Sequence, residues 1–123
     1  MPKTILIVDD SRFTLEINSF VASSAGYAVL TALDGLEALE ILGTNSVDLV
    51  IVDINMPGMD GYELTRKIRS DEVLADVPII IITTESEARD KEKGFAAGAN
   101  SYLVKPVEPD DVVAQIQILI GAS

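Results

Sequence analysis

Three carboxylates, one hydroxyl and one ammonium group each follow a short apolar segment of the sequence. In chain order these residues are Asp9, Asp10, Asp53, Thr83 and Lys105. If the segments are neighbouring parallel strands, their carboxyl ends meet at one edge of a sheet, where open α/β folds bind ligands. The five side chains would then share one crevice. Such a set can hold a hard cation together with a phosphoryl group, because ammonium and hydroxyl groups hydrogen-bond phosphate oxygens.

The three carboxylates should repel one another in such a crevice. Two like charges about 5 Å apart cost roughly 3 kcal/mol at an effective dielectric constant near 20. Lys105 relieves part of this repulsion, and a divalent cation relieves more. Mg²⁺ commonly takes one or two protein carboxylates and keeps water ligands that a phosphate-bearing partner can replace. We therefore predict a Mg²⁺ site at Asp9, Asp10 and Asp53; the acidic spacing of a calcium-binding EF-hand loop is absent.

The composition excludes several other chemistries. The chain has 20 acidic and 9 basic residues, a net charge of −11, no histidine and no cysteine. Thiolate, imidazole and disulfide chemistry are therefore absent, and the charge argues against nucleic-acid binding, which needs clustered Lys and Arg. No apolar run reaches the ~20 residues of a membrane span, and the first residues do not form a signal peptide. We expect a cytoplasmic protein with no membrane partner.

Four apolar segments rich in β-branched residues are too short for helices. They span residues 5–8, 49–52, 79–82 and 102–104. Their continuous hydrophobicity is typical of strands that are buried on both faces of a parallel sheet. A weaker segment near 28–32 is a candidate edge strand.

Helical patterns separate these segments. The first has an apolar stripe of Phe13, Ile17, Phe20 and Val21, and Asp34 with Glu37 resembles the capping box that begins the second. Leu64 and Ile68 mark the third helix, and the fourth should span about 85–97. The fifth should begin near Pro109 and has apolar residues at Val112, Val113, Ile116, Leu119 and Ile120.

The chain therefore alternates strand and helix five times. This alternation predicts one α/β domain with a doubly wound, five-stranded parallel sheet, right-handed crossovers and helices on both faces. The length is that of one domain.

The motifs at the strand ends resemble those of receiver domains of two-component response regulators, with the layout of the single-domain chemotaxis type. They are the acidic pair Asp9-Asp10, Asp53 with its Met-Pro-x-Met-Asp-Gly continuation at 56–61, Thr83, Tyr102 and Lys105-Pro106. The resemblance implies a flavodoxin-like fold with strand order 2-1-3-4-5. It also implies a receiver domain over residues 1–123 with no output domain.

The resemblance implies a role for each acidic residue. Asp53 would accept a phosphoryl group from the phosphohistidine of a histidine kinase or a histidine phosphotransfer protein. Asp10, Asp53 and the backbone carbonyl of Asn55 would bind Mg²⁺, and Asp9 would support it through water. The protein would turn over no external substrate and would not be an enzyme in that sense.

The resemblance also implies a switch. Lys105 and Thr83 would contact the phosphoryl oxygens, and the peptide bond from Lys105 to Pro106 would be cis. Thr83 and Tyr102 would then change the face built from the fourth helix, the last strand and the last helix, and so alter the affinity for a downstream protein. The protein would be a monomer or a weak, phosphorylation-dependent dimer.

Asn55 and Glu85 occupy the positions that tune the phosphoryl lifetime in this family, and both resemble the chemotaxis regulators. Thr84 departs from the family, which usually has Ala, Ser or Gly there. The charged stretch 85–93 is a solvated helix face or part of the partner surface.

Three other functions are compatible with parts of the pattern. A Mg²⁺-dependent phosphatase would have a second Asp two residues after the nucleophile, where this chain has Asn55. A flavin carrier would need Ser, Thr and Gly after the first strand, where two aspartates stand. A scaffold that binds partners without phosphorylation would not require the Asp, Thr and Lys set.

Overall fold

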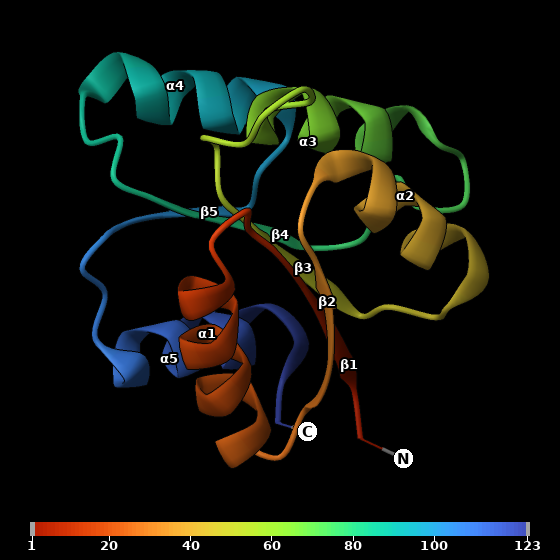
Figure 1. Ribbon diagram of the computed structural model, residues 1–123, viewed down its shortest axis with the longest axis vertical. Coiled ribbons are helices and arrows are strands. Elements are labelled where there is room, and N and C mark those ends of the chain that lie inside the picture. The colour runs from red at the N-terminus through yellow and green to blue at the C-terminus, as the bar shows by residue number, and fades with distance from the viewer. Residues whose placement is uncertain (1, 123) are drawn as a thin grey trace.

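The computed structural model describes residues 2–122 and shows five strands that alternate with five helices (Figure 1). The elements are β1 (Thr4–Val8), α1 (Arg12–Ser24), β2 (Ala28–Ala32), α2 (Gly35–Thr44), β3 (Leu49–Val52), α3 (Gly61–Ser70), β4 (Ile79–Thr83), α4 (Ala88–Ala97), β5 (Ser101–Val104) and α5 (Pro109–Ile120). The alternation and the fold class predicted from the sequence are confirmed.

All neighbouring strands are parallel, in the order β2-β1-β3-β4-β5. The weak segment 28–32 forms the edge strand β2, as predicted, whereas β1, β3 and β4 lie in the middle. Every residue of β3 and β4 is buried. The strand order places the last residues of β1, β3, β4 and β5 along one edge of the sheet.

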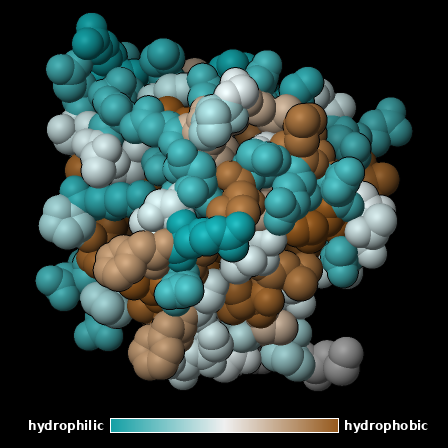
Figure 2. Space-filling model, in the orientation of Figure 1, coloured by the Kyte–Doolittle hydropathy of each residue, from teal (hydrophilic) through white to brown (hydrophobic). Residues whose placement is uncertain are grey.

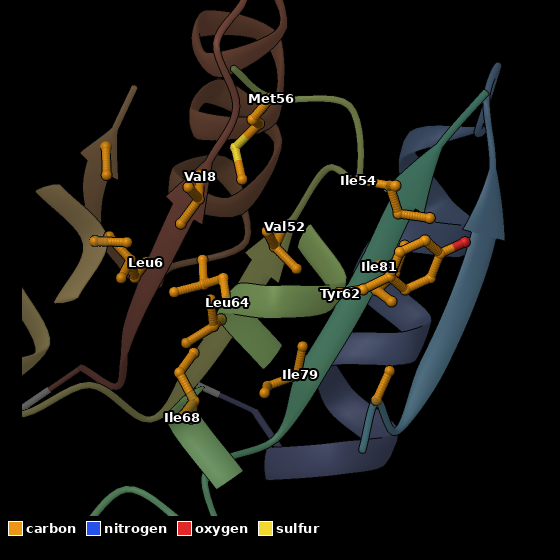
Figure 3. Close-up of a cluster of buried hydrophobic side chains, with 14 of the residues drawn as sticks. Leu6, Val8, Val52, Ile54, Met56, Tyr62, Leu64, Ile68, Ile79 and Ile81 are labelled. Carbon is orange, nitrogen blue, oxygen red and sulfur yellow. The ribbon is translucent and has the colours of Figure 1, made fainter. Parts of the chain in front are cut away.

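Two hydrophobic layers hold the helices on the sheet, with α1 and α5 on one face and α2, α3 and α4 on the other (Figure 1). Alternate residues of a strand face opposite layers: Leu6 and Val8 pack under α2 and α3, and Ile5 and Ile7 pack toward α1 and α5. Figure 3 shows the first of these layers, in which the strand residues pack against Leu64. The alternation fixes the register of each strand.

Helix α1 buries a different set of residues from the apolar stripe seen in the sequence. Leu15, Val21 and Ala22 are buried. Phe13 and Phe20 are instead 71% and 73% exposed. The pattern predicted the helix correctly, because its period is helical, but only Val21 of the stripe reaches the core.

Helix α4 begins three residues later than the approximate start at 85. Glu87 is its N-cap, and the Glu87 backbone N–H donates to the Asp90 carboxylate at 3.2 Å. Residues 84–86 remain in the loop that follows β4. Within residues 2–122, no helix is long and apolar enough to cross a membrane.

Candidate functional site

The acidic residues named by the sequence meet at the carboxyl edge of the sheet. Asp9 and Asp10 follow β1, and Asp53 follows β3, the strand that pairs with β1. One carboxylate oxygen of each lies within 4.8 Å of the others. Asp9 and Asp53 are 3% and 9% exposed, whereas Asp10 is open to solvent. The structure therefore brings together one exposed and two buried carboxylates.

Lys105 is the cation of this cluster. Its ammonium group donates to Asp9 Oδ2 at 3.2 Å and to Asp53 Oδ2 at 3.4 Å. The peptide bond from Lys105 to Pro106 is cis. Burial raises the pKa of Asp9, and so does the nearby charge of Asp53, while the Ser11 N–H and Lys105 act in the opposite direction. The cluster has three carboxylates and one ammonium group, and this excess of negative charge suits a hard cation.

The start of α1 fixes the Asp9 side chain. The Ser11 backbone N–H donates to Asp9 Oδ1 at 2.9 Å, and Ser11 is itself the N-cap whose hydroxyl accepts from the Thr14 N–H. Since these bonds orient one oxygen toward the helix, Asp9 Oδ2 is left to Lys105. The role of Ser11 was not predicted, although a serine before a helical stripe is the usual signal of an N-cap.

The loop after Asp53 returns close to its own start. The Gly61 N–H donates to the Ile54 carbonyl at 2.9 Å. A Cβ atom at Gly61 would lie 2.4 Å from the Asp53 carbonyl oxygen, so no other residue fits without moving the backbone. Gly61 thus allows the first turn of α3 to pack against the backbone of Asp53 and Ile54. Gly61 belongs to the motif at 56–61, but the sequence does not reveal this steric role.

Thr83 is the last residue of β4, the strand that pairs with β3, and Glu85 follows in the next loop. Thr83 is fully buried, and its hydroxyl accepts a long hydrogen bond of 3.4 Å from the Glu85 N–H. The Asn55 amide donates to the Glu85 carboxylate at 3.0 Å. The two residues singled out for phosphoryl lifetime therefore contact each other, and they join the loop after β3 to the loop after β4.

Tyr102 also reaches this loop. Its hydroxyl donates to the Glu85 carbonyl at 2.8 Å, and its half-buried ring lies 6.4 Å, centroid to centroid, from that of Phe95 on α4. Glu85 is consequently held through its N–H, its carbonyl and its side chain. The sequence named the residues around Glu85 but gave no indication of these three bonds.

A match to a family model identifies the chain. Residues 5–117 match the response regulator receiver domain. The chain belongs to this family. It is a receiver domain of the two-component type, a phosphoacceptor signalling domain, and such domains generally bind Mg²⁺ at an acidic pocket.

Solved structures agree with this assignment. The chemotaxis protein CheY4 of Vibrio cholerae is 36% identical with a TM-score of 0.92, over 97% of this chain and 99% of that one. The receiver domain of the sensor histidine kinase PA1611 of Pseudomonas aeruginosa is 32% identical with a TM-score of 0.90. The match covers 99% of this chain and 100% of that one, and that structure has a magnesium ion in its active-site cleft. The predicted strand order is confirmed by the order β2-β1-β3-β4-β5 of the sheet.

The curated relatives are longer proteins. The phosphate regulon transcriptional regulatory protein PhoB of Pseudomonas aeruginosa is 36% identical over 96% of this chain, and the match covers 52% of PhoB. The chain spans about half the length of the curated relatives it matches.

Proposed function

We propose that the protein accepts a phosphoryl group on Asp53 from a phosphohistidine of a partner kinase or phosphotransfer protein. The observation that carries the proposal is the pairing of Lys105 with both Asp53 and Asp9 in a crevice at the ends of four strands. An Asp53 oxygen would attack phosphorus, the bond from phosphorus to the imidazole nitrogen would break, and the imidazole would leave. A carboxylate is already ionised at neutral pH and needs no general base.

The remaining residues position the transferred group and neutralise its charge. Asp10, the Asp53 carboxylate and the Asn55 carbonyl would hold Mg²⁺, with Asp9 acting through water; when bound, the ion neutralises charge on the transferring group. Lys105 would move from the carboxylates toward a phosphoryl oxygen. Phosphoryl transfer requires mainly positioning and charge neutralisation from a protein.

Thr83 and Tyr102 would transmit the change. A phosphoryl oxygen that accepts a hydrogen bond from Thr83 would draw its hydroxyl away from the Glu85 N–H, whose bond is already long at 3.4 Å. Because Tyr102 holds the Glu85 carbonyl, this loop and the α4–β5–α5 face would shift together, altering affinity for a downstream protein or a second copy. The shift between the unphosphorylated and phosphorylated conformations can be only as large as the difference in the interaction free energy that the phosphoryl group has with each.

The Asn55–Glu85 hydrogen bond would set the phosphoryl lifetime. It spans the crevice beside Asp53 and would restrict the approach of water to the phosphoryl group. Asn55 offers an amide and no acidic proton, which argues against turnover of an external substrate. We expect Asn55→Ala to shorten the lifetime of the aspartyl phosphate, measured by loss of bound phosphate after removal of the donor.

The exposed side chains of α1 would receive the phosphodonor. Phe13, Ile17 and Phe20 form an apolar surface, and the cleft that Phe13 lines also includes Lys105. Figure 2 shows apolar side chains at the surface over α1, beside hydrophilic ones in teal. A donor seated on α1 would bring its phosphohistidine to the neighbouring carboxyl edge. Phe20→Ala should slow transfer from a kinase without slowing labelling by a small phosphodonor.

Labelling with acetyl phosphate and Mg²⁺ tests the assignment. Mass spectrometry should find one added phosphoryl group in the wild type and in Asp76→Asn, which removes an exposed acid in the loop before β4. The Asp53→Asn variant should remain unlabelled. Equal labelling of Asp53→Asn would refute the choice of acceptor, and labelling without Mg²⁺ would refute the metal requirement.

A further inference from the structure

Helix α4 contains a glycine in its interior, where glycine does not stabilise a helix. Gly94 is buried in the middle of α4 with its neighbours in helical conformation. Glycine weakens a helix interior relative to alanine. A Cβ atom at this position would lie 2.9 Å from Tyr102 Cδ2, 3.1 Å from Tyr102 Cε2 and 3.0 Å from Ile81 Cδ1. The missing side chain therefore makes room for the Tyr102 ring.

Tyr62 on α3 closes the same space from the other side. It is 6% exposed and belongs to the hydrophobic layer that includes Ile81 and Ile54 (Figure 3). Its hydroxyl donates to the Asp90 carbonyl in the first turn of α4 at 3.1 Å. Lys93 lies 4.9 Å from the centre of its ring. Tyr62 thus attaches α4 to α3 directly beside the position of Tyr102.

The two tyrosine hydroxyls bond to the backbone of neighbouring segments. The Tyr102 hydroxyl donates to the Glu85 carbonyl in the loop after β4, and the Tyr62 hydroxyl donates to the Asp90 carbonyl on α4. Burial raises the pKa of Tyr102, and the neighbouring Tyr62 raises it further. Through these bonds, Tyr102 links strand β5 to the loop after β4, and Tyr62 links helix α3 to helix α4.

We propose that Gly94 and Tyr62 are positioning residues that seat the Tyr102 ring under α4, and that this seat is already filled in the unphosphorylated protein. The inference rests on the proposed function only where it concerns the response to phosphorylation. With the ring seated, a shift of the Glu85 loop would be passed to α4 through Tyr102 and Tyr62. Residues on α3 and α4, outside the acceptor site, would then determine the state of the α4–β5 surface.

Nuclear magnetic resonance of tyrosine labelled with ¹³C at the ε positions can test the seat. The three tyrosines, Tyr27, Tyr62 and Tyr102, give separate ring signals that Tyr→Phe variants assign. A soluble gadolinium chelate reports the solvent accessibility of each ring. Gly94→Ala should displace Tyr102 and remove its protection from the chelate, while the buried Tyr27 keeps its protection.

Gly43→Ala is the matched control, because Gly43 is also helical and nothing lies within 4 Å of the Cβ it would gain. It should leave the signals of Tyr102 unchanged. Tyr62→Phe keeps the ring and removes only the hydroxyl, so it should shift the Tyr102 signals without unfolding the protein. Unchanged accessibility of Tyr102 in Gly94→Ala would overturn the proposal, as would an equal change in Gly43→Ala.

Acetyl phosphate with Mg²⁺ tests the response. The Tyr102 ring of the wild type should be equally protected from the chelate before and after labelling, because it already occupies its seat. A gain in Tyr102 protection when the wild type is labelled would overturn the claim that the seat is filled before phosphorylation. If the wild type is not labelled, the proposed function fails, and the comparison of the unmodified proteins still decides the seat.

Discussion

Replacing Asp9 with Asn should stabilise the protein in the absence of metal. Lys105 at 3.2 Å attracts the Asp9 carboxylate by roughly 5 kcal/mol at an effective dielectric constant near 20. Asp10 and Asp53 have oxygens within 4.8 Å, so each repels it by roughly 3.5 kcal/mol on the same scale. The net repulsion is about 2 kcal/mol, and water around the exposed Asp10 reduces it to about 1 kcal/mol.

The asparagine keeps the shape of the residue, and its Oδ1 can still accept from the Ser11 N–H. For a domain of this length, a gain of about 1 kcal/mol raises the melting temperature by about 4 °C. Mg²⁺ should stabilise the wild type by about 2.7 kcal/mol at a hundredfold excess over its Kd, and should stabilise Asp9→Asn less.

Thermal denaturation followed by circular dichroism, with EDTA or with Mg²⁺, measures both effects. Glu72→Gln makes the same change of net charge at an exposed residue away from the cluster and should alter neither value. A lower melting temperature for Asp9→Asn in EDTA, together with an undiminished response to Mg²⁺, would show that repulsion within the acidic cluster is not what the cation relieves.

Three further predictions concern the surroundings of the site. Arg69→Met should destabilise the protein by about 3 kcal/mol in urea denaturation, because the guanidinium donates to the carbonyls of Gly98, Ala75 and Val77 and to the Asn100 side chain; Arg69→Lys should recover part of the loss. Gly61→Ala should cost about 3 kcal/mol and slow labelling by acetyl phosphate, because its Cβ meets the backbone of Asp53; labelling at the wild-type rate would contradict this. The pKa of Tyr102 is raised in the folded state, which favours the neutral phenol. The contribution of the neutral phenol to stability is therefore complete below about pH 10 and is lost as the pH rises through the folded-state pKa. Between about pH 9 and about 11, the denaturant midpoint of Tyr102→Phe should fall less than that of the wild type.

The sequence predicted the sheet and the grouping of its acidic residues because both depend on local patterns. The segments 5–8, 49–52 and 79–82 are apolar on both faces, and only central strands of a covered parallel sheet bury such segments. Once these strands are neighbours, Asp9 and Asp53 must share an edge. The strand order itself came from the family resemblance, since hydrophobicity alone does not rank the strands.

The contacts that the sequence did not predict depend on distances between separate loops and helices. The bond between Asn55 and Glu85 joins residues 30 positions apart, and no pattern records it. The stripe on α1 illustrates the same limit, because its period predicts a helix but does not say which face meets the sheet. Gly94 is similar: a glycine in a helix indicates close approach, but the approaching ring of Tyr102 is known only from the fold.

The two ends of the described chain meet at the edge of the sheet opposite the acidic cluster. The Lys3 ammonium donates to the Ile120 carbonyl, and the Tyr27 hydroxyl donates to the Gly121 carbonyl at 2.7 Å. Circular permutants are therefore accessible: a short peptide could connect these ends, and new termini could be opened in a surface loop away from Asp53. A fluorescent reporter inserted at such a loop near α4 would convert phosphorylation into an optical signal without obstructing the donor.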